Sequence, residues 1–321
     1  MTLHLDKKLF GELIEATAKN LSLPALYIEK DYWVTYILKK IAQSDYAETA
    51  IFKGGTSLSK AYKVIERFSE DIDLAVITKD KSNNQIKTLI KKIEKDILDE
   101  NFIEIADHEL VSKGSQFRKT MHSYPKIRDG DFGHAIENII LELSSFSRPH
   151  PYGEREISSY ICDFLKEHSS EMVIKYELDP FLLNVLDYKR TFCEKISAIA
   201  RASHESDSEH IKLKEKIRHL YDIHFLMKEE NIQNFINSTE FEEMIGNVRD
   251  DDLKQFNKDW ATIPLSSTEI FMNTSMVLVK LEEFYNTTFR DLVYTEELPS
   301  LNNEIKVSIE NLAKILKEKK L

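Results

Sequence analysis

A glycine pair between a short apolar run and a run with helical spacing constrains this chain more than any other feature. The pair is Gly54-Gly55, which follows the apolar residues 50–52 and precedes Thr56 and Ser57. Either hydroxyl residue is placed to cap the predicted helix. Glycine lets the backbone approach an anion closely, and the free N–H groups at a helix start point toward it. The sequence therefore predicts a strand, a tight turn and a helix that together bind phosphate.

Two acidic residues follow this unit after one helix length. Asp71 and Asp73 flank Ile72, and strand alternation sends both carboxylates to one face and the isoleucine to the other. Carboxylates beside a triphosphate can hold Mg²⁺, which takes hard oxygen ligands and bridges phosphate oxygens. A lone Gly-Gly is usually a turn and a lone Asp-x-Asp is usually a solvated edge. The two motifs joined by one helix are much more specific than either alone.

A third carboxylate interrupts a strongly apolar run further along the chain. Glu142 lies within Ile139-Ile140-Leu141-Glu142-Leu143, a sequence typical of a buried strand. A buried carboxylate is costly unless a metal ion or another cation compensates its charge. Glu142 is therefore a candidate metal ligand, and the alternative is that it faces water at a sheet edge. Glu137, at the start of this strand, is the second choice.

The amino-acid sequences of the two motifs resemble those of a known family. Gly-Gly-Thr-Ser-Leu, followed by Arg-Phe-Ser-Glu-Asp-Ile-Asp-Leu over residues 67–74, is similar to the AbiEii/AbiGii toxin family of polymerase-β-type nucleotidyltransferases. The resemblance implies an α/β (α+β) fold, with a mixed sheet in a nucleotidyltransferase domain and a helical C-terminal domain. We expect these domains to span residues 1–180 and 181–321. The resemblance also implies that Ser69 and the residues 54–57 bind the nucleotide and that Asp71, Asp73 and Glu142 hold one or two Mg²⁺.

The helical half contains a second set of candidates. Lys195 and Arg201 lie on one predicted helix, with Thr191 as its expected cap, and Asp222 lies on a later one. A lysine and an arginine on a helix are usually solvated surface. The resemblance favours a functional role for all three residues. The family pattern differs in having leucine where Ile196 stands and one more residue before the arginine. It implies that Lys195 and Arg201 steady the triphosphate and that Asp222 orients the lysine or helps to bind the acceptor.

Other charged residues leave alternatives open. Lys53 and Lys60 are secondary candidates for phosphate binding, with structural roles as the alternative. Lys30 and Asp31, within Glu29-Lys30-Asp31-Tyr32-Trp33, are expected to form a surface pair. His219 and His224 are expected to be structural, because no pair of histidines shows metal spacing.

Composition indicates a two-domain globular protein without a membrane anchor. The chain has 321 residues, of which 42% are hydrophobic and 31% charged. Its longest apolar runs are too short to span a bilayer, its start lacks a signal-peptide pattern, and Cys162 and Cys193 form no framework. These features predict a cytoplasmic protein with buried cysteines. The net charge of -11 argues against a protein that coats nucleic acid, but it permits a local basic groove.

The remaining segments have their own predicted structures. Helices are expected over residues 5–21, 24–41, 81–98 and 158–166, and strands over 102–110, 117–124 and 172–178. From Pro180 onward the pattern is helical.

The function that the resemblance implies is NMP transfer from an NTP to the 3′ acceptor end of tRNA, which blocks translation. Such proteins are toxins of type IV toxin–antitoxin or abortive-infection modules in phage defence, with a cognate AbiEi-like antitoxin as genetic or physical partner. One alternative is NMP transfer to a protein hydroxyl. Another is a non-catalytic nucleotide-binding component of a defence complex, against which the intact glycine and aspartate motifs argue.

Overall fold

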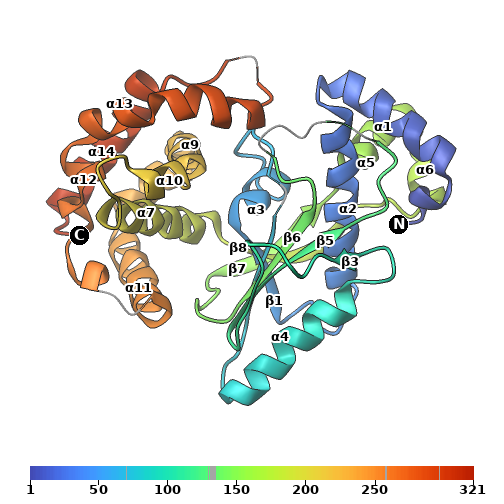
Figure 1. Ribbon diagram of the computed structural model, residues 1–321, viewed down its shortest axis with the longest axis horizontal. Helices are drawn as coiled ribbons and strands as arrows, with labels where there is room; N and C mark the ends of the chain where they lie inside the picture. The colour runs from blue at the N-terminus through green and yellow to red at the C-terminus, as the bar shows by residue number, and fades with distance from the viewer. Residues whose placement is uncertain (70, 129, 131–134, 257–258, 296) are drawn as a thin grey trace. The chain divides into compact units, whose positions relative to one another are not determined.

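A mixed sheet carries both the glycine pair and the acidic residues. In the computed structural model, which describes all residues except 70, 129, 131–134, 257–258 and 296, the sheet has eight strands in the order β3-β5-β6-β2-β1-β8-β7, and β4 pairs with β5 (Figure 1). The strands are β1 (Ala50–Lys53), β2 (Ile72–Val76), β3 (Ile103–Glu104), β4 (Ser112–Lys113), β5 (Phe117–Ser123), β6 (Ile139–Ser144), β7 (Tyr152–Ile157) and β8 (Phe181–Leu186). The α/β class with a mixed sheet is confirmed.

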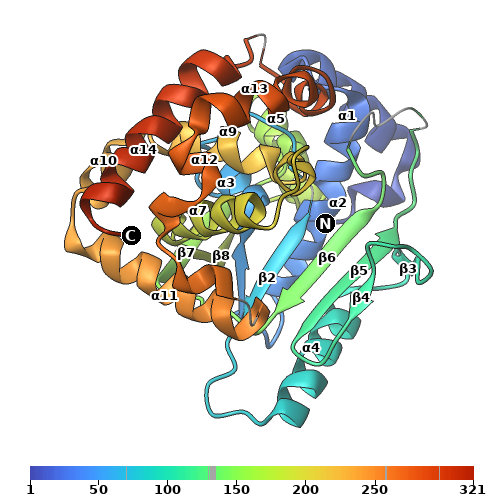
Figure 2. The ribbon, with the colours of Figure 1, turned by 60° about the vertical axis from the view of Figure 1, so that its left-hand side comes forward.

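The central strands are those with the most continuous apolar sequence. β2 pairs antiparallel with β1 and parallel with β6, and β1 pairs parallel with β8 (Figure 2). Residues 50–52 and 139–141 are all fully or almost fully buried. A strand with apolar residues in consecutive positions is usually covered on both faces of its sheet. The burial of residues 50–52 in β1 and 139–141 in β6 agrees with this rule.

Residues 1–186, which contain all strands of the sheet, also form α-helices. They are α1 (Lys7–Leu21), α2 (Ala25–Ala42), α3 (Gly54–Lys60), α4 (Asn83–Ile97), α5 (Tyr160–His168) and α6 (Ser170–Lys175). The helices expected over residues 5–21, 24–41, 81–98 and 158–166 are confirmed with small changes at their ends. α2 buries Tyr32 and Trp33 completely, and Ser82 and Gln85 form a capping box at the start of α4.

Three strands, β4, β7 and β8, were not predicted from the sequence, and one predicted strand is wrong. β8 is the apolar run Phe181–Leu186, which lacks the alternation of a half-buried strand and falls where we expected helix. It is a strand because β1 and β7 pair with its two edges. Residues 172–178, predicted as a strand, include most of α6. The strand expected over residues 102–110 is reduced to Ile103–Glu104.

The chain divides into two compact units, and the second takes in a short segment from the first half of the sequence. The first unit is Met1–Lys63 with Phe68–Leu186, and the second unit is Val64–Arg67 with Asp187–Leu321. The division expected after residue 180 therefore falls before β8, whose pairing keeps it in the first unit.

Among its described residues, the second unit has helices joined by turns and loops, with a β-bridge between Arg67 and Val293 and no strand. Its helices are α7 (Tyr188–His204), α8 (Ile211–Lys214), α9 (Ile217–Leu226), α10 (Glu230–Ile236), α11 (Thr239–Phe256), α12 (Glu269–Met272), α13 (Thr274–Phe284) and α14 (Lys306–Glu318). Within the described chain, no helix has both the length and the apolarity needed to cross a membrane.

The first residues of α7 correct one detail of the sequence analysis. Thr191 was expected as the cap, but the helix begins at Tyr188 and the side chain of Asp187 accepts a hydrogen bond from the N–H of Lys189. Cys162 and Cys193 are buried free thiols, as predicted. Burial raises the pKa of Cys162 to about 11, which keeps its thiol protonated at neutral pH.

His224 on α9 should make the stability of the protein sensitive to mild acid. It is 4% exposed, and its Nδ1 lies 2.8 Å from Ser308 Oγ. Burial, with a contribution from Lys228, lowers the pKa of His224 to about 4, although Glu304 acts in the opposite direction. The unfolded chain, with a histidine pKa of about 6.5, therefore binds more protons than the folded one between these values, and stability falls as the pH drops. We expect a loss of about 2 kcal/mol between pH 7 and pH 5 from this group.

Urea unfolding at the two pH values measures this effect. His224→Gln should remove that part of the pH dependence, because glutamine can still bond Ser308 without titrating. His108→Gln, at an exposed histidine, is the control for loss of a histidine. An identical pH dependence in the wild type and the His224 variant would contradict the assignment.

Candidate active site

The turn after β1 has a conformation that only glycine adopts readily. Gly54 has φ +82° and begins α3 immediately after Lys53. The helix therefore starts earlier than expected, so Thr56 and Ser57 lie in its first turn and do not cap it. The hydroxyl of Ser57 donates to the carbonyl of Gly54 at 2.8 Å, and that of Thr56 lies 3.0 Å from Ser69 Oγ. This last bond brings two predicted nucleotide-binding residues together.

The carboxylate of Asp73 lies directly over Gly54. A Cβ atom at position 54 would be 2.0 Å from Asp73 Oδ2, far closer than any real contact. The register explains this approach, because Asp73 pairs with Lys53 across the antiparallel strands β1 and β2. Because Gly54 has no side chain, the carboxylate of Asp73 can lie directly against the predicted phosphate-binding turn.

The third carboxylate stands next to Asp73 on the neighbouring strand. In the parallel pair β2–β6, Asp73 is directly opposite Glu142, and in the pair β5–β6, Glu142 is opposite Lys119. Residues opposite each other share a face of the sheet. Asp71 precedes β2 by one residue and is half-buried, so the predicted strand begins slightly later than expected. Asp73 and Glu142, two of the three predicted metal ligands, therefore lie next to each other in the sheet.

Glu142 also has a cationic neighbour that the sequence analysis did not identify. Lys119 Nζ lies 3.7 Å from Glu142 Oε2, and both side chains are 28% exposed. Lys119 was visible only as one residue of a predicted strand, and no local pattern indicated that it would face a carboxylate on the next strand. Glu137, the second choice, is outside β6, half-exposed and paired with Lys126.

These carboxylates suit a hard divalent cation. Among the described residues, no three histidine, cysteine or acidic side chains converge as a ready metal cage. Mg²⁺ is usually held by one or two carboxylates together with substrate phosphates and water, so it needs no such cage. The oxygen donors of Asp73 and Glu142 on adjacent strands, with Asp71 two residues from Asp73, fit that manner of binding.

A buried charge cluster in the second unit contains two further candidates. Asp222 on α9 is completely buried, and its carboxylate contacts Arg67 Nε at 2.7 Å and Lys195 Nζ at 2.7 Å. Burial alone would raise the pKa of Asp222, but these two cations hold it well below the usual range. His219 Nδ1 lies 3.4 Å from the same ammonium group, and burial and that charge keep the pKa of His219 well below its ordinary value.

This cluster brings together Lys195 and Asp222, which are separated in sequence, and adds Arg67. Sequence reasoning quoted Arg67 within the second motif without giving it a role. The signal that could have found it was its place at the start of that motif, before Ser69 and Asp71. A guanidinium that makes two bonds to one buried carboxylate is among the strongest ion pairs in proteins.

Two other candidates are engaged elsewhere. The guanidinium of Arg201 lies 3.5 Å from the ring centre of Phe256 and 3.8 Å from a carboxylate oxygen of Asp252. Lys60 is almost fully buried and forms an ion pair with Asp31. The expectation that Lys30 and Asp31 form a surface pair is wrong, because both are buried and each has its own partner.

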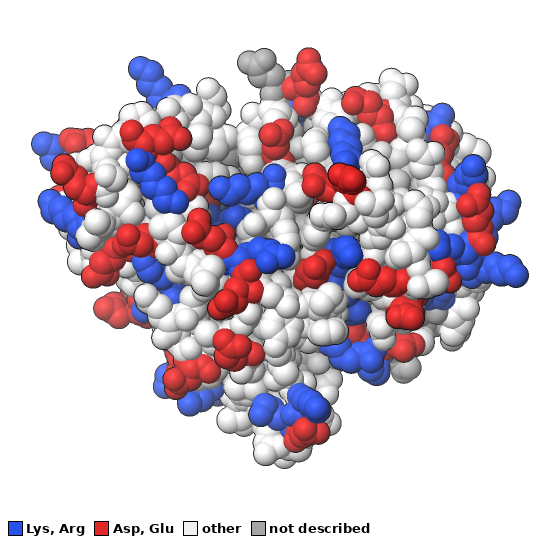
Figure 3. All heavy atoms as spheres, turned by 180° about the vertical axis from the view of Figure 1, so that it is seen from behind, with Lys and Arg blue, Asp and Glu red and all other residues white. Residues whose placement is uncertain are grey.

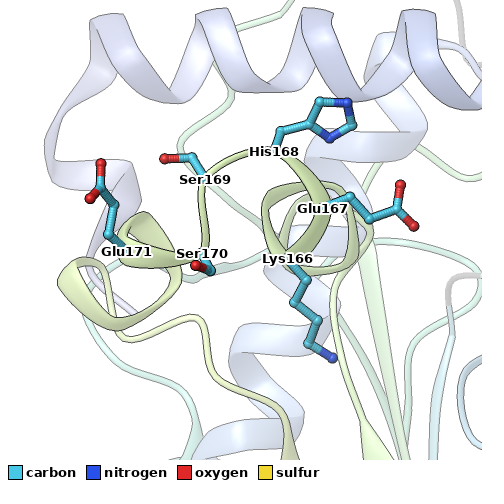
Figure 4. Close-up of a pocket in the computed structure, with 6 residues that line it drawn as sticks. All are labelled: Lys166, Glu167, His168, Ser169, Ser170 and Glu171. Carbon is cyan, nitrogen blue, oxygen red and sulfur yellow. The ribbon is translucent and has the colours of Figure 1, made fainter.

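Three surface hollows lie away from these residues. One of about 320 Å³ is formed by residues 166–171 between α5 and α6, and Figure 4 shows its side chains diverging without a common target. Another of about 530 Å³ lies between α4 and the strands β3–β5, and one of about 560 Å³ lies beside α1.

Acidic and basic side chains are interspersed on the face drawn in Figure 3, so the net charge is not concentrated there in one acidic field.

Comparison with known proteins identifies the class of the protein and then its family. A family model described as "Nucleotidyl transferase AbiEii toxin, Type IV TA system" matches residues 36–307. The chain is therefore a nucleotidyltransferase. It belongs to the AbiEii toxin family, whose substrate is an NTP and whose systems include an antitoxin.

A solved structure supports the fold. MenT4, a nucleotidyltransferase toxin from Mycobacterium tuberculosis H37Rv, is 12% identical and superimposes with a TM-score of 0.55 over 94% of this chain and 98% of its own. At this identity the likeness concerns the fold alone. Among curated proteins, none matches the sequence.

Proposed function

We propose that this chain transfers NMP from an NTP to the 3′ acceptor end of tRNA, in a reaction that depends on Mg²⁺. The observation that carries the proposal is the shared position of Gly54, Asp73 and Glu142, where a phosphate-binding turn meets carboxylates on adjacent strands. Membership in the AbiEii family supports the transfer of a nucleotide, and the choice of tRNA rests on the resemblance alone.

In the proposed site, the residues of the first unit bind and orient the triphosphate. The backbone from Gly54 to Ser57, with Thr56 and Ser69 bonded to each other, holds its β- and γ-phosphates. Asp71 and Asp73, with Glu142 beside them, hold the metal. When bound, Mg²⁺ neutralises charge on the phosphates and lowers the barrier for in-line attack at the α-phosphorus. The acceptor hydroxyl oxygen would bond to the α-phosphorus and lose its proton to water, while the bond from the α-phosphorus to the bridging oxygen of the leaving pyrophosphate breaks.

Lys195 and Asp222 enter the proposal from the family resemblance, supported by a contact within the second unit. The ammonium of Lys195 lies 2.7 Å from a carboxylate oxygen of Asp222. We therefore assign Asp222 the role of orienting Lys195 toward phosphate. We leave Lys60 and Arg201 outside the proposed site, since ionic and aromatic neighbours already engage them.

A transfer assay tests the proposed reaction. Purified protein and Mg²⁺ are incubated with each of the four α-labelled NTPs and total cellular RNA, and the products are separated on a denaturing gel. We expect label in the tRNA band with at least one NTP, and no label when EDTA removes the metal. The two outcomes that contradict the tRNA assignment are label on protein and nucleotide binding without transfer. They would support, respectively, the protein-hydroxyl reaction and a non-catalytic role.

The cellular setting follows from the same proposal. NTPs, Mg²⁺ and tRNA coexist in the cytoplasm, where we place the activity. We expect a cognate AbiEi-like antitoxin to neutralise the growth inhibition that this chain causes. Coexpression with that protein measures the effect as recovered colony formation.

A further inference from the structure

Three consecutive charged residues in α2 are buried, although charged side chains usually lie at the surface. Glu29, Lys30 and Asp31 are 1%, 0% and 6% exposed. Successive residues in a helix point about 100° apart, so such a triplet faces three different neighbours. Burying a charge is costly unless that charge is paired or hydrogen-bonded. Each of the three charged groups should therefore have an ionic or hydrogen-bonding partner.

Asp31 is paired to the last residue of α3. Lys60 Nζ lies 2.5 Å from Asp31 Oδ1, and the two side chains are 7% and 6% exposed. The other carboxylate oxygen accepts the backbone N–H of Tyr160 at 2.9 Å, and Lys60 also donates to the carbonyl of Ser158 at 3.1 Å. These three bonds join α2, the end of α3 and the start of α5 in one buried network.

The other two members hold the segment that leads into β6. The carboxylate of Glu29 accepts the backbone N–H groups of Ile127 at 2.7 Å and Arg128 at 3.1 Å, and Lys30 donates to the carbonyl of Ile136. Tyr27, on the same helix, stacks on Phe68 with ring centres 3.8 Å apart. α2 thus contacts the approaches to both carboxylate strands as well as α3.

We propose that Asp31 and Lys60 are positioning residues, which fix α3 so that its first turn is correctly placed to bind the triphosphate. The inference rests on the proposed function, because it assigns the phosphates to the backbone from Gly54 to Ser57. α3 has seven residues, or about two turns. A helix this short moves as one body, so a shift at Lys60 reaches Gly54. A change of about 1 Å in such a place is enough to weaken a reaction strongly.

The competing explanation is that the pair only stabilises the fold, and a double variant separates the two. Removing one member of a buried ion pair destabilises a protein strongly, whereas replacing both by apolar residues is often neutral. Asp31→Leu combined with Lys60→Met should therefore unfold in urea close to the wild-type midpoint. We expect its KM for NTP, at saturating tRNA, to rise by about tenfold or more, with a smaller change in kcat. Its Kd for the NTP should rise in parallel.

A second buried pair in the same unit is the matched control. Glu94 on α4 and Arg118 on β5 form an ion pair of similar burial, 11% and 13% exposed, and join two elements other than α3. Glu94→Leu combined with Arg118→Met should leave KM for NTP within about twofold of the wild type, as expected for a site that does not touch the triphosphate. A wild-type KM in the Asp31/Lys60 double variant would overturn the proposal, as would an equal rise in both double variants.

Two further arms keep the result decisive. If the double variant does not fold, Lys60→Arg gives the same measurement, because it keeps a positive charge opposite Asp31 while changing the length and hydrogen-bonding geometry of the side chain that holds α3. Wild type and Asp71→Asn are assayed beside these proteins. If the wild type transfers NMP and Asp71→Asn does not, the proposed function is supported, whatever the result for Asp31 and Lys60. If the wild type transfers no NMP, it is the proposed function that fails.

Discussion

Asp71→Asn should lower NMP transfer by about a thousandfold or more while the protein stays folded. The substitution keeps the size of the side chain and removes the charge that would bind the metal. Metal ions contribute several kcal/mol to the stabilisation of charge in a transition state, and each 1.36 kcal/mol is a factor of ten in rate. The measurement is the single-turnover rate of label transfer at saturating NTP and Mg²⁺.

Two controls accompany this variant. Urea unfolding should give a midpoint close to that of the wild type, since Asp71 is only half-buried. Asp45→Asn, at an exposed aspartate outside the site, should transfer at the wild-type rate. Full transfer by Asp71→Asn would rule out its role as metal ligand.

Gly54→Ala should also abolish most transfer, for a steric reason. The new Cβ would lie 2.0 Å from Asp73 Oδ2, and φ of +82° is unfavourable for any residue with a side chain. The backbone strain costs about 1–2 kcal/mol, and the carboxylate must move away. A displacement of about 1 Å of a reacting group can lower a rate by about a hundredfold, so we expect a loss of at least that size.

Gly246→Ala is the matched control for this substitution. Gly246 lies in α11, and a Cβ there meets no atom within 4 Å. Alanine is the better helix former by about 1 kcal/mol, so this variant should be as active as the wild type and slightly more stable. Normal transfer by Gly54→Ala would mean that Asp73 does not need its observed position.

Local features of the sequence were sufficient to predict the strand, turn and helix around Gly54 and the strand that carries Asp73. The apolar run before Gly54, the glycine pair and the Asp-x-Asp spacing depend on turn chemistry and strand alternation, which operate over a few residues. For the same reason the long helices with regular apolar spacing were found, α1, α2 and α4 among them. Glu142 could be proposed because a carboxylate in an apolar run is anomalous wherever the strand lies.

Elements without a distinctive period were not predictable in this way. Phe181–Leu186 is apolar throughout, and a run of that kind is compatible with either a strand or a buried helix until its neighbours are known. The pairing of β8 with β1 and β7 decided its structure, and it also moved the division between the units to residue 187.

The sequence alone indicated the class of this protein, since its glycine pair and Asp-x-Asp motif resemble the AbiEii family, to which the chain belongs. Only the tertiary structure decided which charged residues are near one another. Lys60 was a secondary candidate for phosphate binding, with a structural role as the alternative, and Asp31 was expected at the surface. The two form one buried pair across 29 positions. The partner of a buried charge is set by packing between distant segments, and no spacing within either segment encodes it.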